Sequence, residues 1–195
     1  MNTCTYDGDA TVLTRSHPYT HATSDAAARY LDLRASPALI RTALEDFVPW
    51  SGHPAVDHFY LLLERLNGPR STLESNDCAF SPPQPDADAP LHRRFTCSGR
   101  LMVLFRHLPR NDASEWGAFT HALHVALAAV DTEFDLGVLG TTLVPVRFRL
   151  LPASFPGFQL MVSFWAWGDS EPACLDNLAR LMTNLSPALL EVDAG

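Results

Sequence analysis

The sequence predicts an α+β fold, in which N-terminal helices and later helices pack on a small, mostly antiparallel sheet. Two patterns carry this prediction: helical spacing of apolar residues in the first third of the chain, and alternation of apolar and polar residues in the second half. A short Pro/Gly turn also joins segments 136–151 and 157–167, which favours antiparallel pairing of the two. The 195 residues, 47% of them apolar, are enough for one domain with its own core.

The first third of the chain is predicted to hold a tail and several helices. Residues 1–22 are polar and are expected to form a flexible N-terminal tail, followed by a single α+β domain over 23–195. A short helix is expected up to Leu33, and a serine–proline pair predicts the start of the next, over 36–48, because serine caps a helix and proline suits its first position. A histidine–proline pair opens a further helix over 53–66, which an Asn-Gly-Pro sequence ends.

The middle of the chain is less regular. Residues 71–80 show no helical period, so they form either a strand or a loop against the core. The segment 81–91 (SPPQPDADAPL) holds four prolines and is predicted to be an exposed loop. Residues 100–107 alternate between apolar and polar side chains and predict a strand.

The remaining elements complete a β-α-β-β-α arrangement. An aspartate with a glutamate three residues later has the spacing of a capping box and predicts a helix over 113–131. Long strands are predicted over 136–151 and 157–167, and a helix with proline in its first turn over 171–185, followed by one more helical turn. This order is typical of a sheet that helices cover on one face.

Charge and composition exclude several function classes. The chain has 22 acidic residues and 14 basic ones, all of them arginine, which gives a formal charge of −8 and disfavours nucleic acid or an anionic membrane as a partner. The absence of lysine excludes a lysine base, a Schiff-base lysine and a P-loop lysine. No apolar run of about 18 residues and no signal-peptide pattern is present, and the four cysteines are scattered. We therefore expect a cytoplasmic protein with reduced thiols.

One face of the predicted sheet mixes polar and aromatic side chains. Alternation along the strands separates a purely apolar face, which we expect the helices to cover, from a second face rich in arginine and tryptophan. The candidate ligand-binding residues on this second face are Arg106, Arg147, Arg149, Ser163, Trp165 and Trp167. Arginine stacks on tryptophan, and its guanidinium group forms paired hydrogen bonds with carboxylate or phosphate.

Three interpretations of this mixed face stay open. In the first, the helices over 36–48 and 53–66 cover it and pair its arginines with their carboxylates. In the second, it is the interface of a non-catalytic homodimer, because tryptophan and arginine are enriched at interfaces. In the third, which leads, it lines a pocket for a small anionic or aromatic molecule.

Two groups of residues suggest catalysis or metal binding. Glu74, Asp77 and Cys78 offer a carboxylate base and a thiol nucleophile, although the same residues are also ordinary for a turn with a small core cysteine. His121 and His124 lie three residues apart on a predicted helix, a spacing that places two imidazoles on one metal ion but that solvated histidines also show.

The order of elements from about residue 76 to 168 resembles the YqcI/YcgG family. The matching features are Asn76-Asp77-Cys78-Ala79-Phe80, the strand from Leu101 to Phe105, the helix with Trp116 and Phe119, the segment Leu150-Leu151-Pro152 and the strand from Leu160 to Phe164. The family includes heme-dependent oxygenases that act on amino-acid-like substrates. The resemblance therefore implies a pocket beside the sheet and, as an alternative function, oxygenase-like chemistry at residues 74–78. The family's heme-ligating histidine corresponds to Leu151 here, so no heme ligand is carried over.

Overall fold

The fold is described here from a computed structural model. It describes residues 3–6, 11–14, 20–21, 33–42, 44, 46–131, 133–150 and 153–194. The predicted helix before Leu33 and the predicted boundary after residue 22 lie outside these residues. Within the predicted tail, three short strands are described: β1 (Thr3–Tyr6), β2 (Thr11–Thr14) and β3 (Thr20–His21).

The described strands form one sheet with the order β3-β2-β6-β7-β5-β4, and β1 also pairs with β6. Its centre consists of four long strands: β4 (Leu73–Pro85), β5 (Phe95–Phe105), β6 (Gly137–Leu150) and β7 (Ala153–Gly168). These four pair antiparallel, whereas β1 and β2 pair with β6 in parallel. The predicted mostly antiparallel sheet is therefore confirmed.

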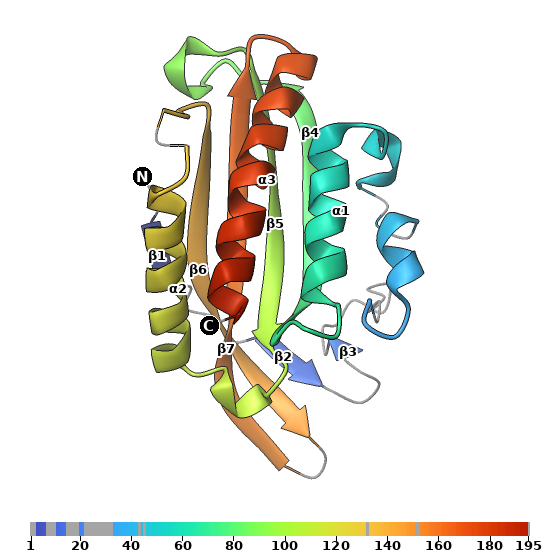
Figure 1. Ribbon diagram of the computed structural model, residues 1–195, viewed down its shortest axis with the longest axis vertical. Helices are drawn as coiled ribbons and strands as arrows, with labels where there is room; N and C mark the ends of the chain where they lie inside the picture. Colours follow the sequence, from blue (N-terminus) through green and yellow to red (C-terminus); the bar gives the residue numbers. More distant parts are fainter. Residues whose placement is uncertain are drawn as a thin grey trace.

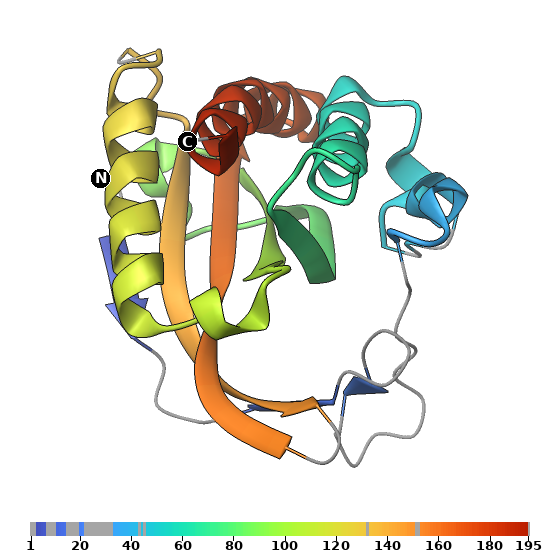
Figure 2. The ribbon, with the colours of Figure 1, turned by 60° about the horizontal axis from the view of Figure 1, so that its bottom comes forward.

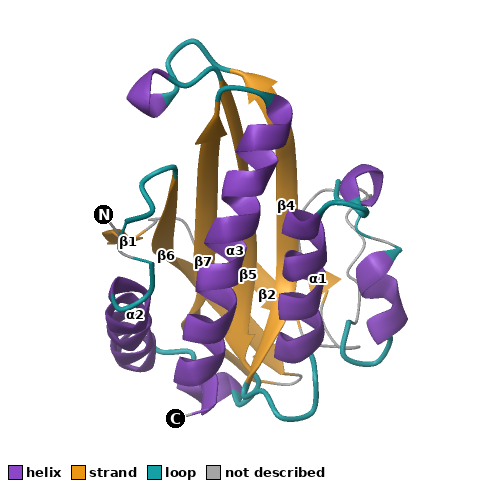
Figure 3. Ribbon diagram, turned by 45° about the horizontal axis from the view of Figure 1, so that its top comes forward, coloured by secondary structure: helices purple, strands orange, loops and turns teal. Residues whose placement is uncertain are grey.

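Three α-helices cover one face of this sheet, as Figures 1 and 3 show. They are α1 (Pro54–Leu66), α2 (Ala113–Ala128) and α3 (Glu171–Ala194). The main core lies between them and the sheet, where Val162 and Phe164 of β7 meet Phe59 of α1 and Leu178 of α3. The predicted α+β class, with helices packed on the sheet, is confirmed. We call this side of the sheet the helix face and the opposite side the outer face.

The sheet is strongly curved at the end where β6 joins β7. Figure 2 shows this hairpin bending away from the helices. A second, smaller apolar cluster forms there, in which Val146 and Phe148 of the hairpin pack with Leu104 and Leu108. The curvature therefore buries the outer face near the hairpin, while the far end of that face keeps exposed side chains.

The predicted helix over 36–48 is wrong. The segment contains two short 3₁₀-helices, η1 (Pro37–Arg41) and η2 (Val48–Trp50), and the described residues between them are not helical. Phe47 accounts for the break, because its ring stacks on Phe59 at 4.6 Å and on Phe80 at 5.2 Å, between α1 and β4. Burial of this one ring outweighs the weak preference of the segment for a continuous helix.

Two other boundaries differ from the prediction. Residues 81–85, predicted as part of a loop, continue β4 at the edge of the sheet, where prolines are tolerated because no further strand needs their missing N–H groups. The last helix does not end at 185 but runs through Pro187 to Ala194. Its final turn is held by Asp193, whose carboxylate accepts hydrogen bonds from Ser71 and Thr72 at the start of β4.

Candidate functional site

The exposed end of the outer face brings together side chains from three strands. On β5 and β7, Arg100 lies directly opposite Ser163, and Ser98 lies directly opposite Trp165. Asp77 of β4 joins them, with its carboxylate 3.0 Å from the Arg100 guanidinium group. We call Asp77, Arg100, Met161, Ser163 and Trp165 the outer patch.

Trp165 is the largest exposed apolar side chain of the outer patch, with 38% of its surface accessible. Its indole ring lies across β6 at Gly140, where an added Cβ would be 3.5 Å from the ring. The side chains of Arg100 and Asp77 are 47% and 38% exposed, so the ion pair beside the indole is also open to solvent. The outer patch thus combines an aromatic surface with one positive and one negative charge.

Arg147 and Arg149 do not lie beside the tryptophans, and this part of the predicted site is wrong. Arg147 pairs with Pro156 and Arg149 with Ser154, whereas Trp165 pairs with Val138. Arg147 and Val138 are nine residues apart on β6, roughly 30 Å along an extended strand, and an odd separation places them on opposite faces. In the antiparallel hairpin, the end of β6 pairs with the start of β7. The two arginines therefore lie beside the start of β7, whereas the tryptophans lie near its end.

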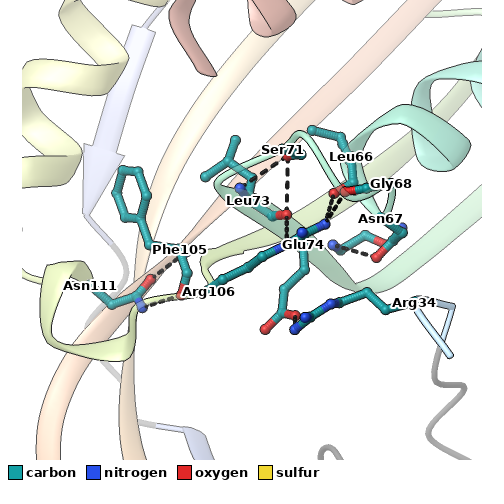
Figure 4. Close-up of polar contacts among 11 residues, drawn as sticks. Arg34, Leu66, Asn67, Gly68, Ser71, Leu73, Glu74, Phe105, Arg106 and Asn111 are labelled. Atoms are coloured by element: carbon teal, nitrogen blue, oxygen red, sulfur yellow. Dashed lines mark hydrogen bonds and ion pairs between the residues drawn. The ribbon is translucent and has the colours of Figure 1, made fainter. Parts of the chain in front are cut away.

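Arg106 is also not part of the outer patch, because it closes a loop (Figure 4). Its guanidinium group donates hydrogen bonds to the backbone carbonyls of Leu66 and Gly68, at 2.9 and 2.6 Å, and to that of Leu73 at 2.7 Å. These contacts satisfy carbonyl groups at the C-terminal end of α1 and in the turn that leads into β4. Of the predicted ligand-binding residues, Ser163, Trp165 and the half-buried Trp167 share the outer face.

A β-bulge separates Glu74 from the other two candidate catalytic residues, Asp77 and Cys78. The register of β4 shifts between Ser75 and Asp77, so that Asp77 faces outward opposite Met102 and Cys78 faces the helices opposite Leu101. Glu74 is only 1% exposed, and its carboxylate pairs with Arg34 at 2.6 Å. The carboxylates and the thiol therefore point into three different surroundings and do not form a base–nucleophile pair.

The Cys78 thiol is protected from ionisation. Burial, followed by the nearby carboxylates of Asp77 and Asp46, raises the pKa of Cys78 to about 12. A thiol with this pKa carries very little thiolate at neutral pH, and the thiolate is the nucleophilic form. This environment suits a core cysteine better than a catalytic one.

The alkylation rate of native Cys78 is expected to keep rising with pH where the rate of an ordinary cysteine levels off. In the native protein, its rate with iodoacetamide should still rise about tenfold per pH unit between pH 8 and pH 10, because the pKa lies above this range. Mass spectrometry of the Cys78 peptide measures this rate, with the urea-unfolded chain as the control, whose rate should level off near pH 9. A native plateau at or below pH 9 would contradict the raised pKa.

The side chains of His121 and His124 on α2 have different surroundings. His121 is exposed, whereas the ring of His124 turns toward the sheet, with its Nε2 atom 3.2 Å from the Thr141 hydroxyl. Burial, and then the charge of His121, lowers the pKa of His124. In the part of the chain that the structure describes, no group of three potential metal ligands lies together.

Comparisons with known proteins leave the outer patch as the main guide to function. No family model, no curated protein and no solved structure matches the chain. The resemblance to the YqcI/YcgG family therefore stays a prediction. No helix among the described residues is both long and apolar enough to cross a membrane.

Proposed function

We propose that the protein is a non-catalytic interaction module that forms a homodimer through the outer patch. The observation that carries this proposal is Trp165, a large aromatic side chain that is 38% exposed on the sheet face opposite the three described α-helices. Met161 lies on the same face of β7 as Trp165. Arg100 of β5 is opposite Ser163, which lies between these two residues on that face. Tryptophan, methionine and arginine are among the side chains enriched at protein interfaces.

The charges of the outer patch favour a second copy of the chain as the partner. In a twofold interface the same patch meets itself, so each residue contacts a different residue of the other copy. Asp77 and Arg100 are neighbours on the patch and have opposite charges. Two copies placed antiparallel bring each Arg100 to Asp77 of the other, while the indole of Trp165 is buried between them.

A small anionic ligand is less well supported. Its site was expected to contain three arginines, of which Arg147 lies on the opposite face and Arg106 binds backbone carbonyls. The arginine that does lie on the patch, Arg100, is already paired with a carboxylate. The described part of the patch therefore has no second guanidinium group that could bind the carboxylate or phosphate of a ligand.

Sedimentation equilibrium of the full chain tests the proposal. The wild type is expected to be dimeric, and Trp165→Ala to weaken the dimer by about 30-fold, the loss typical of a central aromatic residue. Val125→Ala is the matched control, because Val125 is 59% exposed on α2, away from the patch, and should leave association unchanged. A wild type that stays monomeric at high concentration, or equal weakening by both variants, would overturn the proposal.

A further inference from the structure

Two buried cysteines lie together on the helix face, on the opposite side of the sheet from the outer patch. Cys97 of β5 is directly opposite Ala166 of β7, and the Cys174 thiol donates a hydrogen bond to the Ala166 carbonyl at 3.2 Å. The Cys97 thiol donates a hydrogen bond to the backbone carbonyl of Cys174 at 3.8 Å, so the two cysteines lie next to each other. Both residues have free thiols and are at most 1% exposed.

The start of α3 fixes this contact. The Ser170 carbonyl accepts a hydrogen bond from the Cys174 N–H at 2.9 Å, and the Ser170 hydroxyl accepts one from Ala173. At the end of β7, Gly168 approaches this turn so closely that an added Cβ would be 2.4 Å from the Cys174 nitrogen. The first turn of α3 is therefore held against β5 and β7 in the folded protein, which keeps the two cysteines next to each other.

We propose that Cys97 and Cys174 form a reversible disulfide bond when the protein meets a low-molecular-weight disulfide such as oxidised glutathione. In the first step, the Cys174 sulfur attacks one sulfur of the small disulfide, which forms a mixed disulfide and releases one thiolate. In the second, the Cys97 sulfur attacks the Cys174 sulfur and releases the second thiolate. The two protons of the cysteine thiols end on the two released thiolates, so two cysteines are oxidised and one small disulfide is reduced.

The environment favours Cys174 as the first nucleophile. The adjacent Cys97 thiol lowers the pKa of Cys174, and the Cys174 side chain, together with burial, raises the pKa of Cys97. Cys174 also lies in the first turn of α3, where the helix dipole stabilises a negative charge. Because both thiols are buried, the reaction proceeds from a locally opened form of this helix end or during folding.

The experiment refolds the reduced, unfolded full chain in a buffer of reduced and oxidised glutathione. Free thiols are then blocked with iodoacetamide, and the linked peptides are identified by mass spectrometry. We expect the wild type to lose the mass of two hydrogens and to give one linked pair, Cys97 with Cys174. Cys78→Ser, the control, should keep the link, and Cys97→Ser should lose it. The oxidised protein should also unfold at a higher denaturant concentration than the reduced one, because the link closes a long loop.

Peptide mapping of the wild type keeps the proposal testable even if Cys97→Ser does not fold. Recovery of Cys97 and Cys174 as alkylated thiols would overturn the proposal. A link from either residue to Cys4 or Cys78, or a glutathione adduct that persists on Cys174, would overturn it as well.

Discussion

Replacing Asn111 with alanine is expected to lower the free energy of unfolding by about 3 kcal/mol. Asn111 is buried in the loop between β5 and α2 (Figure 4). Its side-chain amide accepts a hydrogen bond from the Phe105 N–H at 2.9 Å and donates to the carbonyls of Phe105 and Leu108 at 2.9 and 3.1 Å. Alanine leaves these buried backbone groups without a partner, and each such group costs about 1–3 kcal/mol.

Urea unfolding followed by circular dichroism measures this loss. Asn184→Ala is the matched control, because the Asn184 amide is half-buried and makes one long hydrogen bond, 3.5 Å, to Asp131. That change should cost no more than about 0.5 kcal/mol. Equal losses at the two positions would show that the Asn111 amide does not secure the loop.

Replacing Gly99 with alanine is expected to lower the free energy of unfolding by about 3 kcal/mol. An added Cβ at Gly99 would lie 2.3 Å from the Phe164 ring and 2.5 Å from the Ala79 carbonyl oxygen, well inside contact distance. Gly99 has β4 on one side and β7 on the other, and the Phe164 ring stacks over it within the main core. Neither the ring nor the backbone of β4 can move without disturbing the packing of α1.

Gly117→Ala is the control for this prediction and should raise the free energy of unfolding instead of lowering it. Gly117 lies on the exposed side of α2, and an added Cβ there meets nothing within 4 Å. Alanine is favoured over glycine in a helix, so this variant should gain up to about 1 kcal/mol. Thermal unfolding of both variants measures the difference, and a Gly99→Ala protein as stable as the wild type would refute the close contact with Phe164.

Periodicity predicted most of the elements that make up the fold. The apolar stripes of α1, α2 and α3 and the alternation in β5, β6 and β7 are local patterns, and each element forms where it was expected, although α3 continues past its expected end at 185. The segment around Phe47 was mispredicted because its conformation depends on a distant contact, with Phe80 of β4. Local spacing contains no information about such a contact.

The candidate site was only partly predictable for the same reason. Alternation correctly placed Ser163, Trp165 and Trp167 on one face of β7. It did not fix how far Arg147 lies from Trp165, because that depends on the register of the hairpin. It also could not place Cys78, because the bulge in β4 reverses the faces that follow it.

Arg100 was the member of the outer patch that the sequence prediction overlooked. Both Arg100 and Arg106 fall in the predicted strand over 100–107, an even number of residues apart, and alternation therefore assigns them to one face. Only Arg100 stays within β5, where it faces Ser163, while Arg106 follows the end of the strand. The alternation within β5 was therefore enough to place Arg100 on the same face of the sheet as Ser163.

Mixing two charge-reversal variants tests the proposed dimer most directly. Arg100→Asp alone places only carboxylates on each patch, and Asp77→Arg alone places only guanidinium groups there, so each variant should be monomeric in sedimentation equilibrium. Mixed in equal amounts, the two variants should form a heterodimer, because every charge of one patch then meets its opposite on the other. Circular dichroism of each variant checks that it is folded. A mixture that stays monomeric, or single variants that dimerise as well as the wild type, would contradict the outer patch as the homodimer interface.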